Sequence, residues 1–305
     1  MHPSRARAGR HRRGSPATAA STRGATFHHP VFARRRRKRG AVIAVVLSLA
    51  FIAGVGFVTV RSLAQQAAAK PTCRVASSSG SYLLDVEQAA NASTIAAVGK
   101  RAGLPDHAVT IALAAAIQES QLHNLPYGDR DSLGLFQQRP SQGWGTRSQL
   151  LTPRFAAAAF FGALARVPNW NAIAVADAAQ AVQHSNAPEA YGNWESEART
   201  LAIALTGEKP AGFGCRLGVD RAAHAAGPLQ AAMAAELGVV KLGDPLPAAR
   251  GWTVATWLVA HAQQFGITSV SYDGRRWTPS SAEWRAVPGA GLRVQFTQAP
   301  FTAPR

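Results

Sequence analysis

A glutamate ends an apolar stripe on a predicted helix, where its carboxyl group could exchange protons with a substrate. Ala112, Ala115, Ala116 and Glu119 recur at three- and four-residue spacing, so they share one face of a helix predicted over 106–120. Burial among apolar groups raises the pKa of a carboxyl group, and a proton held near neutrality suits a general acid. The competing interpretation is a helix-end glutamate that only points to water.

A long loop follows this glutamate. Residues 121–148 are too long, and too rich in glycine, proline and aromatic residues, for an idle connector. Gly134 allows the backbone to approach a ligand closely, and Gln137 carries an amide that both donates and accepts hydrogen bonds, as sugar recognition requires. The loop is therefore the predicted wall of a site around Glu119.

Two short motifs resemble a known family. Ile-Gln-Glu-Ser at 117–120 is followed, after 13 residues, by Gly-Leu-Phe-Gln at 134–137 and then by Pro140. This pattern resembles the superfamily of soluble-type lytic transglycosylases and goose-type lysozymes, over about residues 85–210. The run 127–140 is also similar to a group of single-pass membrane proteins of high-GC actinobacteria.

The resemblance implies a lysozyme-like fold in which Glu119 is the single catalytic acid and base for the MurNAc–GlcNAc bond of peptidoglycan. In that family, the residue protonates the leaving oxygen and then deprotonates the sugar's own 6-hydroxyl, which yields an anhydro product. The resemblance also implies that Ser120 orients Glu119 or a substrate group. The expected substrate-binding residues are Ser120, Tyr127, Asp129, Asp131, Gly134, Leu135, Phe136, Gln137, Gln183 and Tyr191.

Two later family motifs are altered. Ala-Tyr-Asn-Ala-Gly is replaced by Ala-Val-Gln-His-Ser at 181–185, and the motif Glu-Thr-Arg-x-Tyr ends in leucine here. Tyr191 or Tyr127 could replace the missing tyrosine. Alternatively, Asp129 or Asp131 supplies a second carboxylate for hydrolysis, for which separations of about 6.5–9.5 Å suit inversion and about 5–5.5 Å suit retention. The altered motif also favours an alternative function, a module that binds cell-wall glycan or a partner protein without turnover.

Other residues near the loop have two interpretations. Arg130 and Arg139 either bind substrate carboxylates or pair with the neighbouring aspartates. Tryptophan faces suit sugar rings but more often pack in cores, and this choice concerns Trp144, Trp170 and Trp194. Because no histidines lie at metal-ligand spacing and no phosphate-binding loop is present, we expect neither a metal nor a cofactor.

The charge of the chain is concentrated at its start. Lys and Arg number 33 against 16 Asp and Glu, a net charge of +17, of which residues 1–40 carry +12 without any carboxylate. Residues 41–60 are uncharged and long enough to span a hydrocarbon core of about 30 Å. We therefore expect a cytoplasmic tail, one transmembrane helix and an extracytoplasmic remainder, with a cleaved secretory signal as the alternative. Residues 83–215 hold 9 basic and 11 acidic residues, so no specific nucleic-acid binding is expected.

The remaining expectations concern organisation. Cys73 and Cys215 both lie on the predicted outer side, where disulfides form, so we expect a bridge; two free thiols are the alternative. Helices are predicted over 85–102, 106–120, 152–166, 172–184, 189–206, 221–236 and 252–265, and strands over 267–273 and 292–298.

The predicted fold class is mainly α, a lysozyme-like helical domain after one transmembrane helix, with a small C-terminal α+β unit. The expected partners are peptidoglycan strands and, through one helix, the membrane; the sequence does not identify protein partners. The predicted segments are a disordered basic tail at 1–40, a transmembrane helix at 41–60, a linker at 61–82, a lysozyme-like domain at 83–215, a linker with a short helix at 216–249 and an α+β unit at 250–301.

Overall fold

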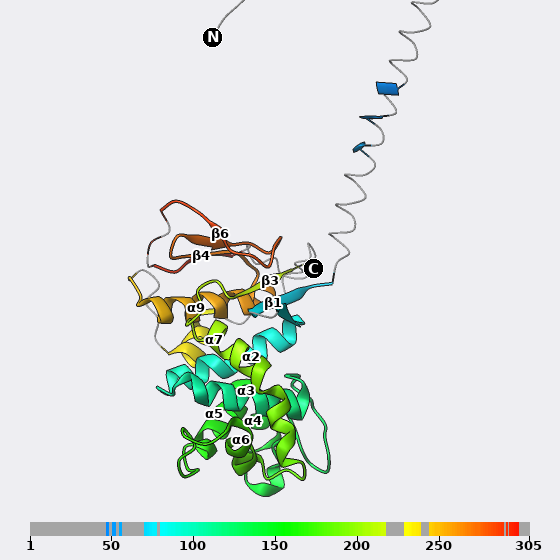
Figure 1. The fold of residues 1–305 in the computed structure, drawn as a ribbon, viewed down its shortest axis with the longest axis vertical. Helices are drawn as coiled ribbons and strands as arrows, with labels where there is room; N and C mark the ends of the chain where they lie inside the picture. Colours follow the sequence, from blue (N-terminus) through cyan, green and yellow to red (C-terminus); the bar gives the residue numbers. More distant parts are fainter. Residues whose placement is uncertain are drawn as a thin grey trace, which may run out of the picture. The chain divides into compact units, whose positions relative to one another are not determined.

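A computed structural model describes most of the chain beyond residue 70. The described residues are 47–48, 51–52, 55–56, 70–77, 80–217, 229–238, 244–289, 291 and 293–298. The chain divides into two compact units, Met1–Arg61 and Ser62–Arg305, and the second contains every candidate site residue (Figure 1).

The transmembrane helix expected at 41–60 is not supported. Crossing a bilayer takes about 20 apolar helical residues. Of this stretch only 47–48, 51–52 and 55–56 are described, and they are helical. Among the described residues, no helix is both long and apolar enough to cross a membrane. The predicted fold class is therefore wrong as stated. The basic tail at 1–40 lies outside the described residues.

Helices dominate the second unit. They are α2 (Val86–Arg101), α3 (Asp106–Ser120), α4 (Arg147–Leu150), α5 (Pro153–Leu164), α6 (Val175–Gln183), α7 (Glu195–Leu205), α8 (Leu229–Leu237), α9 (Ala248–Ala260) and α10 (Ala262–Phe265), with 3-10 helices η1 (Pro140–Gln142) and η2 (Pro188–Trp194). The predictions for α2, α3, α5 and α6 are confirmed within three residues at each end. The helix expected over 189–206 is divided, because η2 precedes α7.

The central element is α3, which contacts α2, α5, α6 and α7 (Figure 1). Its side chains are buried from Ala108 to Ile117. Five alanines in this helix let the neighbouring helices approach closely. The helix ends where Gln121 adopts a left-handed conformation with φ of 52°. The helix α3 therefore reaches the surface only at its two ends.

A three-stranded antiparallel sheet closes one side of the helical group. Its order is β2-β1-β3, with β1 (Thr72–Ser77), β2 (Gly80–Leu84) and β3 (Phe213–Arg216). Cys73 lies directly opposite Cys215, and the predicted disulfide between them is confirmed. The linker expected at 61–82 is wrong for the strand residues, because pairing with β3 and the disulfide order this Ser- and Gly-rich segment. Residues 61–69 and 78–79 lie outside the described residues.

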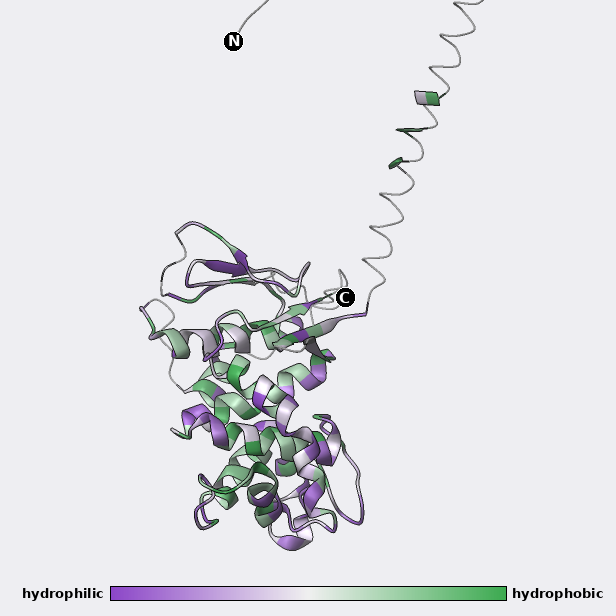
Figure 2. Ribbon diagram, in the orientation of Figure 1, coloured by the Kyte–Doolittle hydropathy of each residue, from purple (hydrophilic) through white to green (hydrophobic). Residues whose placement is uncertain are grey.

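A second antiparallel sheet follows the order β6-β5-β4-β7, with β4 (Ile267–Tyr272), β5 (Arg275–Trp277), β6 (Arg285–Ala286) and β7 (Gln295–Gln298). It packs on α9, which also contacts α2 and α7. Trp252, Trp257 and Trp277 are fully buried in this region. Figure 2 shows hydrophobic residues along the central helices and hydrophilic residues on exposed strands of this sheet.

A shared carboxyl pair connects the start of α3 with the end of α7. Lys100 Nζ donates to Asp106 Oδ1 at 2.7 Å, and Thr206 Oγ1 donates to Asp106 Oδ2 at 2.9 Å. A hydrogen bond to Asp106, together with burial, raises the pKa of Glu208 to about 7. Burial would raise the pKa of Asp106, but its hydrogen bonds to Glu208, Lys100 and Thr206 lower it. The pair therefore keeps a proton on Glu208 in mild acid and loses it as the pH rises through about 7.

This pair predicts a stability that falls as the pH rises. The pKa of Glu208 is raised from 4.5 to about 7, so its contribution is complete below pH 4.5 and is lost as the pH rises through 7. Asp106 acts in the opposite direction, and its contribution is lost only when the pH falls through its lowered pKa. Glu208→Gln keeps a hydrogen-bond donor without the titration. The Tm of the wild type should therefore decline between pH 5 and 8 by roughly 2–4 °C, which corresponds to about 1 kcal/mol of solvent-screened interaction. The Tm of Glu208→Gln should show no such decline.

Thermal unfolding followed by circular dichroism at several pH values measures this effect. Asp244→Asn removes an exposed carboxylate elsewhere and serves as the matched control, with the wild-type pH profile expected. Parallel profiles for Glu208→Gln and the wild type would show that the pair shares no proton.

Candidate active site

Glu119 lies in the last turn of α3, where the helix leaves the core. Its side chain is partly exposed, whereas residues 108–117 are buried. The Tyr191 hydroxyl donates a hydrogen bond to Glu119 Oε1 at 2.6 Å. Of the two tyrosines that the sequence left open, the structure brings Tyr191 to Glu119 and leaves Tyr127 68% exposed.

Tyr191 is a fully buried donor. Burial raises the pKa of its phenol well above the ordinary value, and the hydrogen bond to Glu119 acts in the same direction, against a smaller opposing effect of Ser185. The phenol therefore keeps its proton and fixes Glu119 Oε1. No described residue donates a hydrogen bond to Glu119 Oε2, so this second oxygen is available for proton exchange.

The hydroxyl of Ser120 connects the loop to α3 by hydrogen bonds. Its buried hydroxyl lies 3.0 Å from the carbonyl oxygen of Ala116 and 2.8 Å from that of Leu135. Both partners are backbone acceptors, so Ser120 positions residues 134–137 and makes no hydrogen bond to the Glu119 carboxylate in the described structure.

Within the loop, residues 133–138 form a tight turn that is held by their own backbone. Leu133 and Gln138 form an isolated antiparallel bridge. Between them, Gly134 has a φ of 73°, and a Cβ atom there would lie 2.3 Å from the Leu150 carbonyl oxygen. The Gln137 side chain donates to the carbonyl oxygens of Gly134 and Tyr127 at 3.2 and 3.3 Å. The glycine is therefore required by close backbone packing.

Two predicted binding residues of the loop point into the core. Leu135 is fully buried, and the Phe136 ring stacks on Phe160 at a centroid distance of 4.7 Å. The backbone of Phe136 instead contacts α6, because Gln183 Nε2 donates to its carbonyl oxygen at 2.9 Å. The structure thus brings Ser120 and Gln183 together on adjacent carbonyl groups of the loop.

Asp131 is a fixed anion. It accepts hydrogen bonds from Arg139 Nε at 2.7 Å and from the Ser141 backbone N–H at 2.8 Å. These bonds hold the pKa of the Asp131 carboxyl far below its ordinary value, so it is a poor base. Asp129 is largely exposed, and its Oδ2 lies 3.7 Å from Arg130 Nε. Neither aspartate hydrogen-bonds to Glu119 among the described residues.

Trp194, the last residue of η2, supports the site, and Glu197 lies in α7, which follows. Trp194 Nε1 donates to Gln118 Oε1 at 2.7 Å, so this tryptophan fixes the residue next to Glu119. Glu197 has a pKa raised by burial, and it makes no hydrogen bond or ion pair with any described residue. The altered Glu-x-Arg motif contains Glu197, but the motif alone did not predict that this side chain is partly buried.

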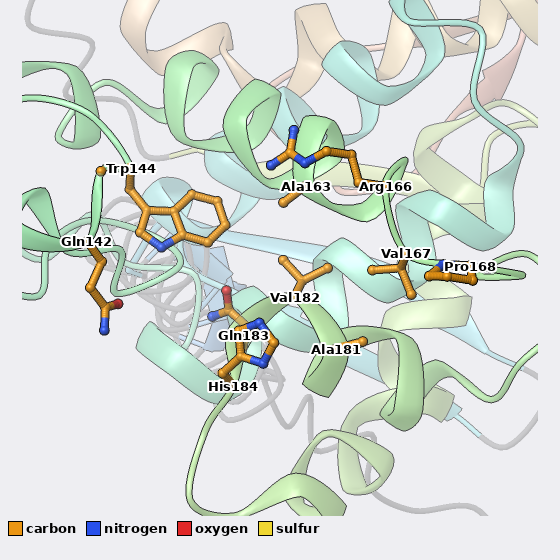
Figure 3. A pocket seen from close by; sticks show the side chains of 11 residues that line it. Gln142, Trp144, Ala163, Arg166, Val167, Pro168, Ala181, Val182, Gln183 and His184 are labelled. Atoms are coloured by element: carbon orange, nitrogen blue, oxygen red, sulfur yellow. The ribbon is translucent and has the colours of Figure 1, made fainter.

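Gln183 also lines a cavity of about 620 Å³ (Figure 3). It is lined by the end of α6, the segment after α5 and the turn at 142–144; Glu119 itself is not in its lining. Of the other tryptophans, Trp144 lines the cavity, and Trp170 stacks on His107 with ring centroids 6.4 Å apart. The described residues include no group of three or more potential metal ligands.

Comparison with known proteins gives one partial match. Residues 192–295 match the model of a family described as VldE, C-terminal domain. The match spans roughly a third of the chain and begins just after Tyr191, so it includes α7, α9 and most of the second sheet but not Glu119. A search of curated proteins finds no match. The resemblance to lytic transglycosylases therefore depends on the motifs around Glu119.

The turn at Gly134 predicts a specific loss of stability. Gly134→Ala introduces both a strained positive φ and a collision with the Leu150 carbonyl oxygen. We expect a loss of about 1–2 kcal/mol from the backbone conformation and about 1–3 kcal/mol from the overpacking. Urea unfolding measures the sum.

Gly143→Ala is the matched control, because Gly143 has a φ of 81° and a Cβ atom added there would meet nothing within 4 Å. It should lose the backbone contribution alone. Equal losses in the two variants would contradict the close approach of Leu150 to the turn.

Proposed function

We propose that the protein cleaves glycosidic bonds of peptidoglycan, as a lytic transglycosylase or a muramidase, with Glu119 as general acid and base. The observation that carries this proposal is the 2.6 Å hydrogen bond from Tyr191 to Glu119. It supplies the tyrosine that the altered motif lacks, from a different position in the chain. A module that only bound glycan would not require a buried phenol fixed on one oxygen of a carboxyl group.

The chemistry uses one carboxyl group twice. Protonated Glu119 donates its proton from Oε2 to the bridging oxygen, the bond from that oxygen to C1 breaks, and positive charge develops at C1. Ionised Glu119 then removes a proton from the 6-hydroxyl of the same sugar, whose oxygen bonds to C1 and closes the anhydro ring. If water takes the place of the 6-hydroxyl, the same steps give hydrolysis.

The surrounding groups favour this single-carboxylate route. Asp131 is held as an anion by Arg139 and Ser141, and Asp129 is largely exposed. Tyr191 keeps Oε1 in one orientation, so Oε2 carries both proton transfers. The disulfide between Cys73 and Cys215 supports a location outside the cytoplasm, since disulfides persist in oxidising compartments.

Substitution of the acid tests the proposal. The full chain and its Glu119→Gln variant are incubated with purified peptidoglycan, and the released muropeptides are separated and weighed by mass spectrometry. We expect Glu119→Gln to lower the rate by about 10²–10⁴-fold, because general acid–base catalysis contributes that much. Glu195→Gln, which removes a surface carboxylate paired with Arg199, is the matched control and should keep full activity.

The products distinguish the two reactions. Anhydro-muropeptides from the wild type indicate transglycosylation, and reducing ends indicate hydrolysis. If the wild type releases no product, the protein is not a glycosidase and the binding-module alternative replaces this proposal.

The tyrosine gives a second test. Tyr191→Phe removes one hydrogen bond to a charged group, which contributes about 1.5–3 kcal/mol, so kcat should fall roughly tenfold to 100-fold with little change in KM. Tyr82→Phe changes a tyrosine of β2, whose hydroxyl lies 3.3 Å from Ser196 Oγ, and should leave kcat unaltered. Equal rates for Tyr191→Phe and the wild type would exclude a positioning role for the phenol.

A further inference from the structure

A second cavity, of about 490 Å³, lies where α2, the start of α5 and α8 meet the junction of α9 and α10. This volume lies within the range of small-ligand sites. Its lining contains a cluster of three polar residues, Thr94, Glu236 and His261, in contact with one another. The cavity shares no residue with the candidate active site or with the cavity that Gln183 lines.

Glu236 is a largely buried carboxylate without a cation beside it. Its side chain is 16% exposed, and Oε2 accepts hydrogen bonds from Thr94 Oγ1 at 2.8 Å and from Trp257 Nε1 at 2.7 Å. Both donors are neutral. Among the described residues, no Lys or Arg forms an ion pair with Glu236, and none donates to its Oε1. Buried charges are normally paired, so this carboxylate lacks a partner.

His261 does not supply the missing positive charge. Burial lowers the pKa of its imidazole, against the opposing effects of Glu236 and of the Trp257 carbonyl group, so the ring is neutral at pH 7. Nδ1 lies 2.9 Å from the Trp257 carbonyl oxygen, which only accepts, so Nδ1 carries the proton and Nε2 is an acceptor.

The Nε2 atom of His261 lies beside the carboxylate without a donor of its own. It is 3.4 Å from Thr94 Oγ1 and 4.0 Å from Glu236 Oε2. The single hydroxyl hydrogen of Thr94 is donated to Glu236. The cluster therefore presents a negative charge and an unsatisfied nitrogen acceptor side by side.

This combination suits a primary ammonium group. Such a group has one positive charge and three N–H donors, so it can bond to Glu236 and to His261 Nε2 at the same time. It neutralises the carboxylate and satisfies the imidazole in one contact. A metal ion has less support, because the described residues include no group of three or more His, Cys, Asp or Glu ligands.

The lining also holds a group of the opposite sign, Arg154 in the first turn of α5. Arg154 is exposed and makes no hydrogen bond or ion pair with a described residue. Arg101, which lines an adjoining cavity together with Arg154, is engaged with the Ala235 carbonyl oxygen. Arg154 and Glu236 thus line one cavity without pairing with each other. A guanidinium binds a carboxylate through paired, charge-assisted hydrogen bonds.

Much of the remaining lining is small and apolar. It includes Ala90, Pro153, Ala231, Ala232 and Ala235, and no Phe, Tyr or Trp. Such walls suit an aliphatic chain, since they offer apolar contact and no aromatic face.

We propose that this cavity binds a zwitterion of the amino-acid type, with its ammonium group on Glu236 and His261, its carboxylate on Arg154 and an aliphatic side chain against the alanines. The two charges of the ligand then match the two charges that the protein leaves unpaired. The inference is independent of the proposed function, because it uses no residue around Glu119.

Matched probes test this assignment by ligand-observed NMR titration of the full chain. Leucine carries both charges, leucinamide only the ammonium group and N-acetylleucine only the carboxylate. We expect leucine to bind at least tenfold more tightly than either. Glu236→Gln, whose amide oxygen still accepts from Thr94 and Trp257, should weaken leucine and leucinamide at least tenfold and leave N-acetylleucine unchanged. Arg154→Gln should weaken leucine and N-acetylleucine and leave leucinamide unchanged.

Control variants separate the cavity from general surface charge. Arg166→Gln removes an exposed arginine outside this cavity, and Glu195→Gln removes a surface carboxylate; both should keep the wild-type affinities. If Glu236→Gln does not fold, the exposed Arg154 variant decides alone. The inference is overturned if no probe binds, if leucine binds no better than the two singly charged probes, or if Arg154→Gln weakens leucinamide as much as leucine.

A fourth probe distinguishes two sources of the same chemistry. Leucylglycine keeps an ammonium group and a carboxylate but separates them by a peptide unit. Tighter binding of leucine identifies a free amino acid as the ligand, and tighter binding of leucylglycine identifies a short peptide. Both results support the zwitterion site, provided that they depend on Arg154.

Discussion

The burial of α3 on all sides is the constraint on which the rest of the structure depends. Its small side chains let α2, α6 and α7 approach closely, and every residue from Ala108 to Ile117 is buried as a result. A polar side chain can leave such a helix only at its ends. Asp106 at the start is bound by Lys100 and Thr206, and Glu119 at the end meets Tyr191.

The helix α7 connects these two ends. Thr206 bonds to Asp106 at the start of α3, while Trp194, at the other end of α7, bonds to Gln118. The two helices are therefore antiparallel. The far side of α7 is covered by α9, whose Thr253 donates to the Thr206 carbonyl oxygen at 2.7 Å. The segment that matches the VldE C-terminal family contains both α7 and α9, so it includes the support of the site and excludes its acid.

The sequence predicted the parts of the fold that depend on local pattern. Helical periodicity located α3, and the spacing of its alanines placed Glu119 at the end of the buried face. The strand β1 was missed because its residues are ordered by β3 and by a disulfide to a residue 142 positions away. The uncharged run at 41–60 predicted a membrane helix from its length and hydropathy. Of this run only 47–48, 51–52 and 55–56 are described, and no described helix is long and apolar enough to cross a membrane.

The candidate site was likewise predicted only in part. Sequence alone did not distinguish Tyr191 from Tyr127 as the partner of Glu119, since only tertiary packing decides which phenol is buried beside it. Leu135 and Phe136 were expected in the site because they belong to a motif, but tertiary packing buries both side chains in the core.

The distribution of charge around Glu119 explains how one carboxyl group could act alone. Both aspartates of the loop lie beside arginines of the loop, Asp131 beside Arg139 and Asp129 beside Arg130. The direct contact at the Glu119 carboxylate is the neutral phenol of Tyr191. A neutral donor can hydrogen-bond to Glu119 in both of its protonation states. It does not become an uncompensated buried charge in either state. A buried lysine or arginine in that place would instead hold Glu119 ionised and prevent it from acting as an acid.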